Sequence, residues 1–144
     1  MIQGPRGVWL GGRQTLYKGG TGMYIYYQPN PCGRSVRDCS IRALTMALGV
    51  SWETAFDLAA KFAKNMCDMP DSDWVWGAVL RSHGYKRVTI PNNCPECYTV
   101  AQFAKDHQSG IYVLGLGGHV TVIKDGDIYD IWDTSNEVPI YAWY

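Results

Sequence analysis

The feature that most constrains the fold of this chain is a single change in the period of its apolar residues. Between residues 38 and 83 apolar side chains recur every three or four positions, as they do on one face of a helix. From residue 111 onward they alternate with polar ones, which is typical of strands with one buried face. We therefore expect an α+β protein in which N-terminal helices are followed by an antiparallel sheet.

The length of 144 residues suits one domain, residues 1–144, because it is long enough to bury a core but short for two ordinary domains. Within that domain, residues 1–22 are rich in glycine and predict an irregular arm. The alternating run from Met23 to Tyr27 then predicts a strand.

Capping residues set the expected bounds of four helices. Asp38 is a good N-cap and Gly49 a good C-terminal stop for the first helix, and Ser51 is a good N-cap for the second. Asp71 or Ser72 begins the third, and Thr99 begins a short fourth. The second helix has an apolar face that we expect to pack on the core, formed by Trp52, Phe56, Ala59, Phe62, Ala63 and Met66.

In the C-terminal third, Asp125 and Gly126 stand between two alternating runs and predict a tight β-hairpin. Closing the chain on this turn pairs Val122 with Tyr129. The same register brings Thr121 opposite Asp130. A separate strand is expected over residues 86–90.

Charge and cysteine content exclude several classes of function. Thirteen basic and thirteen acidic residues give no net charge, so bulk attraction to nucleic acid or to an anionic membrane is not expected. The chain shows neither the apolar run of a signal peptide nor a stretch long enough to span a bilayer. Five cysteines, an odd number, argue against a disulfide framework and favour a cytoplasmic protein.

Cys39 is the candidate nucleophile. It directly follows the expected N-cap Asp38, so it lies where the free amides of a helix N-terminus stabilise a thiolate. The alternative is a small buried residue that opens a core helix, which is the more common fate of a cysteine considered alone.

His119 and an acid on the next strand complete a possible constellation. His119 follows two glycines, which leave the imidazole accessible and suit it to act as a general base. On strict alternation Asp130 shares the face of His119. Asp133 lies nearer to the level of His119 along the paired strands, but a bulge or the end of the strand has to turn it inward. We expect Asp133, or Asp130 in its place, to orient the ring.

Three segments together resemble the papain-like cysteine peptidases: DCSIRAL at a helix start, GGHVTVI on a strand and IYDIWD on its hairpin partner. The resemblance is closer to small variants encoded in bacterial and phage genomes, on the Asn30–Pro31 turn, on Asp38 with Cys39, and on the YD.WD pattern. It covers roughly residues 24–144 and implies a papain-like α+β fold. It also implies a hydrolase that cleaves a peptide or related amide bond through a Cys-His-Asp triad and a thioester, with a peptide or protein substrate and no cofactor. The implied location is the cytoplasm of a bacterium or of a phage-infected host.

The sequence departs from the larger papain pattern at Gly33, where that family carries a glutamine that donates to the oxyanion. We expect the backbone amide of Cys39 to act instead, together with the side chain of Asn30 or, second, Gln28. The alternative for Asn30 is a purely structural role in starting the turn before Pro31.

Other motifs leave alternatives open. Cys94 and Cys97 form one CxxC pair, but no second pair is present, so we expect a stiffened loop and no metal site. An amidase, isopeptidase or acyltransferase could use the same triad. Two alternatives lie outside catalysis: a non-catalytic binding or virion-associated module on this fold, and a small adaptor held together by zinc.

Overall fold

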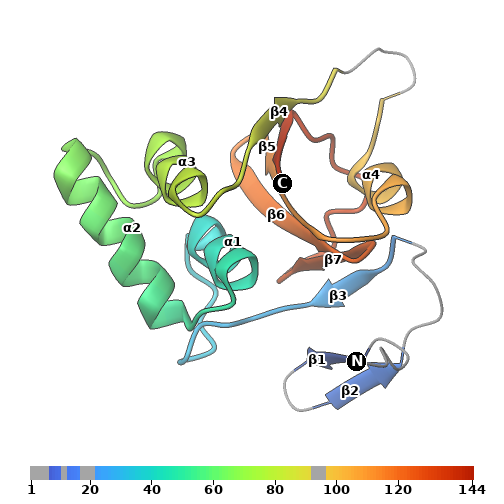
Figure 1. Cartoon of the computed structure of the whole chain (residues 1–144). Helices are drawn as coiled ribbons and strands as arrows, with labels where there is room; N and C mark the ends of the chain where they lie inside the picture. Colours follow the sequence, from blue (N-terminus) through green and yellow to red (C-terminus); the bar gives the residue numbers. More distant parts are fainter. Residues whose placement is uncertain (1–6, 11–12, 17–21, 92–96) are drawn as a thin grey trace.

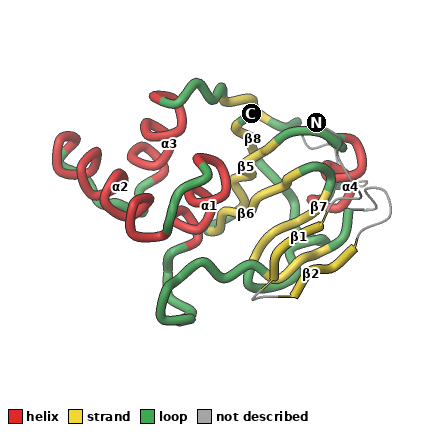
Figure 2. Tube along the Cα trace, turned by 60° about the horizontal axis from the view of Figure 1, so that its bottom comes forward, coloured by secondary structure: helices red, strands yellow, loops and turns green. Residues whose placement is uncertain are grey.

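The computed structural model describes residues 7–10, 13–16, 22–91 and 97–144. The described part is a mixed α+β structure with four helices and a six-stranded sheet. Figures 1 and 2 show three of the helices grouped on one side of that sheet and the fourth on the other side. The helices are α1 (Cys39–Leu48), α2 (Trp52–Met66), α3 (Asp73–Ser82) and α4 (Val100–Asp106).

The sheet has the strand order β3-β7-β6-β5-β8-β4. Its strands are β3 (Tyr24–Tyr26), β4 (Arg87–Thr89), β5 (Ile111–Leu116), β6 (His119–Lys124), β7 (Asp127–Asp130) and β8 (Tyr141–Trp143). Every neighbouring pair is antiparallel except β3 and β7, which run parallel. The expectation of a wholly antiparallel sheet is therefore wrong at this edge. A parallel pair needs a long connection, and here the four helices and three strands between β3 and β7 supply it.

The expected irregular arm contains regular structure. Strands β1 (Gly7–Leu10) and β2 (Arg13–Leu16) pair antiparallel in a small sheet of their own. The prediction of an irregular arm is wrong for these eight residues. The rest of the predicted arm, except Gly22, lies outside the described residues.

The two faces of the sheet bury separate apolar clusters because side chains alternate along each strand. On one face Val113, Val122 and Trp143 pack with Leu44 of α1 and Val79 of α3. The opposite face packs against α4, and its cluster contains Leu114, Ile123, Ile128, Ala142 and Phe103. The sheet is thus covered on both sides, and α1 is held against β5 and β6.

The predicted apolar face of α2 is confirmed in part: Ala59 and Ala63 are buried, and Trp52 and Phe62 pack partly buried against the core. Ala55, Ala59 and Ala63 are the buried residues of this helix, whereas Phe56 and Met66 are each 42% exposed. Small side chains let α2 lie close to its neighbours α1 and α3. Phe56 and Met66, which the sequence pattern placed in the core, lie at the edge of this contact.

The predicted hairpin is confirmed. Val122 pairs with Tyr129 across β6 and β7, and both turn residues, Asp125 and Gly126, have positive φ angles of 51° and 83°. A two-residue turn of this kind matches the twist of the strands it joins. The register of the hairpin decides which residues of β7 lie beside the start of β6.

Candidate active site

Cys39 is the first residue of α1, as predicted, and its side chain is half-buried. The carboxylate of Asp38 does not cap this helix. It instead accepts hydrogen bonds from Arg42 and, at 2.8 Å, from the indole nitrogen of Trp52. The side chain that usually covers a helix start is therefore engaged elsewhere, and the first-turn amides beside Cys39 lack that cap.

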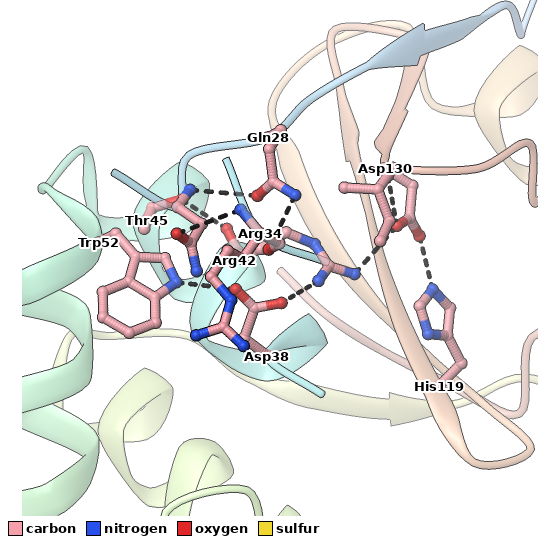
Figure 3. Close-up of polar contacts among 10 residues, drawn as sticks. Gln28, Arg34, Asp38, Arg42, Thr45, Trp52, His119 and Asp130 are labelled. Atoms are coloured by element: carbon pink, nitrogen blue, oxygen red, sulfur yellow. Dashed lines mark hydrogen bonds and ion pairs between the residues drawn. The ribbon is translucent and has the colours of Figure 1, made fainter. Parts of the chain in front are cut away.

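His119 stands at the start of β6 and contacts both Cys39 and Asp130. Its Nε2 atom lies 2.7 Å from Oδ2 of Asp130, and the ring lies close enough to the Cys39 side chain for each group to shift the pKa of the other. Because Nε2 faces the carboxylate, Nδ1 is the ring nitrogen left to face sulfur. The structure therefore places the Cys39 thiol of α1, the His119 imidazole of β6 and the Asp130 carboxylate of β7 in one row. The imidazole and the carboxylate are seen in Figure 3.

Burial raises the pKa of the Cys39 thiol, but the hydrogen bond and the charge of His119 outweigh it. With smaller effects of the Val120 backbone amide and the Arg42 charge, the pKa is lowered overall. For His119, burial lowers the pKa, but the bonds to Asp130 and Cys39 raise it to about 9. Both shifts favour a thiolate beside an imidazolium near neutral pH.

Of the two acids considered for this position, the structure brings only Asp130 to His119. Asp130 is 2% exposed, and its Oδ1 atom accepts a hydrogen bond from the backbone amide of Ile131 at 2.7 Å. Asp133, which the sequence analysis placed first, accepts a hydrogen bond from the backbone amide of Ser135 at 3.0 Å and is exposed. The pairing of β7 with β6 is regular up to Tyr129, and Asp130 follows it as the last residue of the strand, so no bulge is needed to aim Asp130 toward His119.

Arg42 is a site residue whose central position in the polar network the sequence did not indicate. It is 4% exposed and lies between two carboxylates, Asp38 and Asp130, with Nη2 donating to Oδ1 of Asp130 at 3.2 Å. The network runs without a break from Trp52 through Asp38, Arg42 and Asp130 to His119 (Figure 3). The spacing of Asp38 and Arg42, one helical turn apart, was the available signal. The sequence did not show that the pair is buried.

A cleft of about 620 Å³ opens at Cys39 and His119. Its other walls carry residues from α3 and the turn before it, from the loop before α1 and from the segment after β7: Val36, Arg37, Asp71, Asp73, Ile131 and Trp132. The ring of Trp132 lies 5.0 Å from that of His119, measured between centroids, and shields one side of the imidazole. Reactive groups at the wall of a concave site of this size are positioned to meet a bound chain.

The two glycines before His119 leave this side of the cleft open. A Cβ added at Gly117 or Gly118 would meet no atom within 4 Å, and Gly118 lines the cleft. Gly118 also has a φ angle of 76°, which the turn between β5 and β6 requires.

The expected oxyanion donors Gln28 and Asn30 are engaged by their own loop. Oδ1 of Asn30 accepts from the backbone amide of Cys32 at 2.9 Å, and Nε2 of Gln28 donates to the carbonyl of Arg34 at 3.2 Å (Gln28 and Arg34 are labelled in Figure 3). Neither residue lines the cleft. The structural alternative for Asn30, a turn-forming residue, describes its contacts.

Ser40, next to the candidate nucleophile, is a polar residue that the sequence analysis did not consider. It is 2% exposed and contributes to the cleft wall, but its hydroxyl has no hydrogen-bond partner within the described part of the chain. A buried hydroxyl normally finds a partner, so an unpaired one beside a reactive residue is notable.

No group of three or more potential metal ligands occurs among the residues that the structure describes. Cys94, one half of the CxxC pair, lies outside them. The remaining histidines, His83 and His107, each face a backbone carbonyl one turn earlier in or beside their helices, at 2.8 Å.

In comparisons with known proteins, no family model, no curated protein and no solved structure matches the chain. Within the described ranges no helix is long and apolar enough to cross a membrane.

Proposed function

We propose that the protein is a papain-like thiol hydrolase that cleaves a peptide or related amide bond, with Cys39 as nucleophile, His119 as acid and base, and Asp130 as the residue that orients His119. The observation that supports this most directly is the chain of contacts from the Cys39 thiol through His119 to Asp130. The order of the three residues along the sequence and the elements that carry them agree with the resemblance on which the proposal also draws.

The proposed reaction begins with attack of the Cys39 thiolate on the carbonyl carbon of the scissile bond. His119, as imidazolium, donates its proton to the leaving nitrogen while the carbon–nitrogen bond breaks, which leaves a thioester on Cys39. Water then attacks the thioester. His119 takes the proton of that water, and the acid product leaves with the thiol restored.

Asp130 stabilises the imidazolium form and fixes the ring so that Nδ1 faces the sulfur. Arg42 acts one step further back as a positioning residue, because it holds the second oxygen of the same carboxylate. Arg42 is itself held by a buried pairing with Asp38, so it anchors the Asp130 carboxylate to α1, the helix that also carries Cys39.

For the oxyanion we propose the backbone amide of Cys39 together with the hydroxyl of Ser40. The amide belongs to a helix start that Asp38 does not cap, and the hydroxyl has no partner among the described residues. An unpaired donor next to the nucleophile is available at the moment when negative charge develops on the carbonyl oxygen. To reach the oxyanion, the Asn30 side chain would first have to break the hydrogen bond that it accepts from the Cys32 amide in its turn.

The test is covalent trapping by a short peptide that carries a vinyl sulfone, followed by mass spectrometry of the digested protein. Cys39 is expected to react faster than Cys32 and Cys67 in the same molecule, although both of these are more exposed. The variant Cys39→Ala controls for background, and a vinyl sulfone without a peptide measures general thiol reactivity. Equal rates at the three cysteines would rule the proposed nucleophile out.

Turnover is tested separately with a library of fluorogenic peptides. Release of free carboxylic acid indicates hydrolysis, whereas transfer to an added amine identifies an acyltransferase that uses the same groups.

A further inference from the structure

A second cavity, of about 300 Å³, lies between α3 and the β4 edge of the sheet. We name it the arginine pocket; its wall includes Asp73, Trp74, Arg81, Arg87, Tyr141 and Trp143. None of the three proposed triad residues belongs to it.

Two guanidinium groups in the arginine pocket are stacked on aromatic rings. Arg87 of β4 lies 4.1 Å from the centroid of Tyr141, and Arg81, in the last turn of α3, lies 5.4 Å from that of Trp143. Arg87 is also the direct partner of Trp143 across β4 and β8. Stacking restrains the side chains and leaves the N–H edges of each guanidinium free to bind an anion.

Neither arginine forms an ion pair with an acid of the described ranges. The one carboxylate in the pocket wall, Asp73, has its two oxygens at the indole nitrogen of Trp76 (3.1 Å) and the hydroxyl of Tyr141 (3.2 Å). Two positive charges and one negative charge leave the pocket with an excess of positive charge. A planar anion that accepts two hydrogen bonds is the ligand that fits a guanidinium best.

The arginine pocket adjoins the cleft of Cys39, because Asp73 lines both cavities. Within the cleft, Asp71 and Asp73 disfavour an acidic group on the α3 side. A chain that leaves the cleft past Asp73 reaches Arg81 and Arg87, where an acidic group is favoured.

We infer that the arginine pocket binds a carboxylate of the substrate, so that the enzyme acts on acidic peptides. This inference rests on the proposed function for its reaction, although the binding itself does not require turnover. The carboxylate has two possible sources, an acidic side chain or the C-terminus of the bound peptide.

Three acetylated pentapeptides separate these sources: one with a central glutamate and an amidated C-terminus, one with glutamine in its place, and the glutamine peptide with a free C-terminal carboxylate. Each is titrated into the Cys39→Ala protein while NMR follows the Nε–H signals of Arg81 and Arg87. The indole N–H of Trp143, which has no partner in the described part of the chain, is a further reporter. The glutamate peptide or the free-carboxylate peptide is expected to bind about tenfold more tightly than the neutral one, in line with a charge-assisted contact.

The double variant Arg81→Gln/Arg87→Gln is expected to remove this preference, and Arg81→Lys/Arg87→Lys to retain part of it. The variant Lys61→Gln, which removes charge from the exposed side of α2, is expected to leave it unchanged. Equal binding of all three peptides to the unmutated pocket, or shifts that spare both arginines, would overturn the inference. Trapping of Cys39 by the vinyl sulfone is scored independently, so an inert Cys39 counts against the proposed function and not against the carboxylate site.

Discussion

The start of α1 and the loop that precedes it, residues 27–37, are adjacent in sequence but use polar side chains in opposite ways. At the start of α1, contacts reach far along the chain: Arg42 bonds to Asp130, 88 residues away, and Asp130 to His119, 11 residues away. In the loop, Gln28 and Asn30 bond to backbone groups no more than six residues away.

This difference separates residues that the fold positions from residues that shape their own turn. The network at α1 forms only once helix and hairpin have packed, so its geometry depends on the whole domain. The bonds of Asn30 need only the local chain. If the account is right, substitutions in the network change catalysis strongly, whereas matched substitutions in the loop change it little.

The largest effect is expected for Cys39→Ala, which removes the nucleophile from the network. Peptide hydrolysis and trapping by the vinyl sulfone should both fall to the background. Cys32→Ala, in the loop, is the matched control and should retain full activity, because Cys32 is exposed and does not line the cleft. Residual trapping in Cys39→Ala, or loss of trapping in Cys32→Ala, would contradict the assignment of the nucleophile to the network at α1.

The next largest effect is expected for Asp130→Asn. Loss of the carboxylate removes the partner that orients and stabilises protonated His119, so kcat/KM should fall by about 10³ to 10⁴. Asp133→Asn is the matched control, and it should stay within about twofold of the parent, since among the described residues Asp133 bonds only to Ser135. Steady-state kinetics on both variants would contradict the account if the Asp133 variant were the more impaired.

Ser40→Ala and Asn30→Ala compare the two regions as sources of an oxyanion donor. Loss of the Ser40 hydroxyl should lower kcat by about 10² without lowering the free energy of unfolding, because that hydroxyl has no partner to lose among the described residues. Asn30→Ala should do the reverse, with near-normal kcat and a loss of about 1 kcal/mol in stability. Kinetics and urea denaturation of the same preparations check both predictions. A large loss of kcat in the Asn30 variant alone would identify Asn30, and not Ser40, as the oxyanion donor.

The smallest effect on activity is expected for Arg42, which acts through Asp130. Arg42→Met takes the only arginine away from two buried carboxylates that it pairs with among the described residues, so the free energy of unfolding should fall by about 3 to 5 kcal/mol. In folded protein, kcat should fall by about tenfold, and loss of the positive charge should raise the pKa of the Cys39 thiol. Arg42→Lys should restore part of the stability. An unchanged pH profile in both variants would make Arg42 a residue of the fold alone.

The sequence predicted those parts of the site that depend on local patterns. The start of α1 followed from Asp38 and its end from Gly49, and the register of β6 and β7 followed from the Asp125–Gly126 turn. Strict alternation on that register pointed to Asp130. The preference for Asp133 required a bulge or the end of the strand to turn it inward; β7 does end at Asp130, but Asp133 is exposed and accepts a hydrogen bond from Ser135.

What the sequence missed depends on packing between distant elements. Phe56 looked like a core residue, but α2 approaches its neighbours through alanines, so Ala55 is buried in addition to the predicted Ala59 and Ala63, and Phe56 is exposed. The burial of Arg42 arises from the meeting of α1 with the end of β7, two elements more than 80 residues apart. Likewise, the parallel pairing of β3 with β7 has no local signal, because the turn chemistry that predicts hairpins does not apply to long connections.

The most direct test of the central claim is the pH dependence of Cys39 alkylation by iodoacetamide, with Cys32 and Cys67 as internal references on the same chain. The thiolate is the reactive form, so the rate rises as pH passes the thiol pKa. The account predicts that the Cys39 inflection lies below that of the two reference thiols, and that it moves upward in His119→Ala because the imidazolium no longer stabilises the thiolate. An inflection of Cys39 at the same pH as those of Cys32 and Cys67, unchanged by the loss of His119, would contradict it.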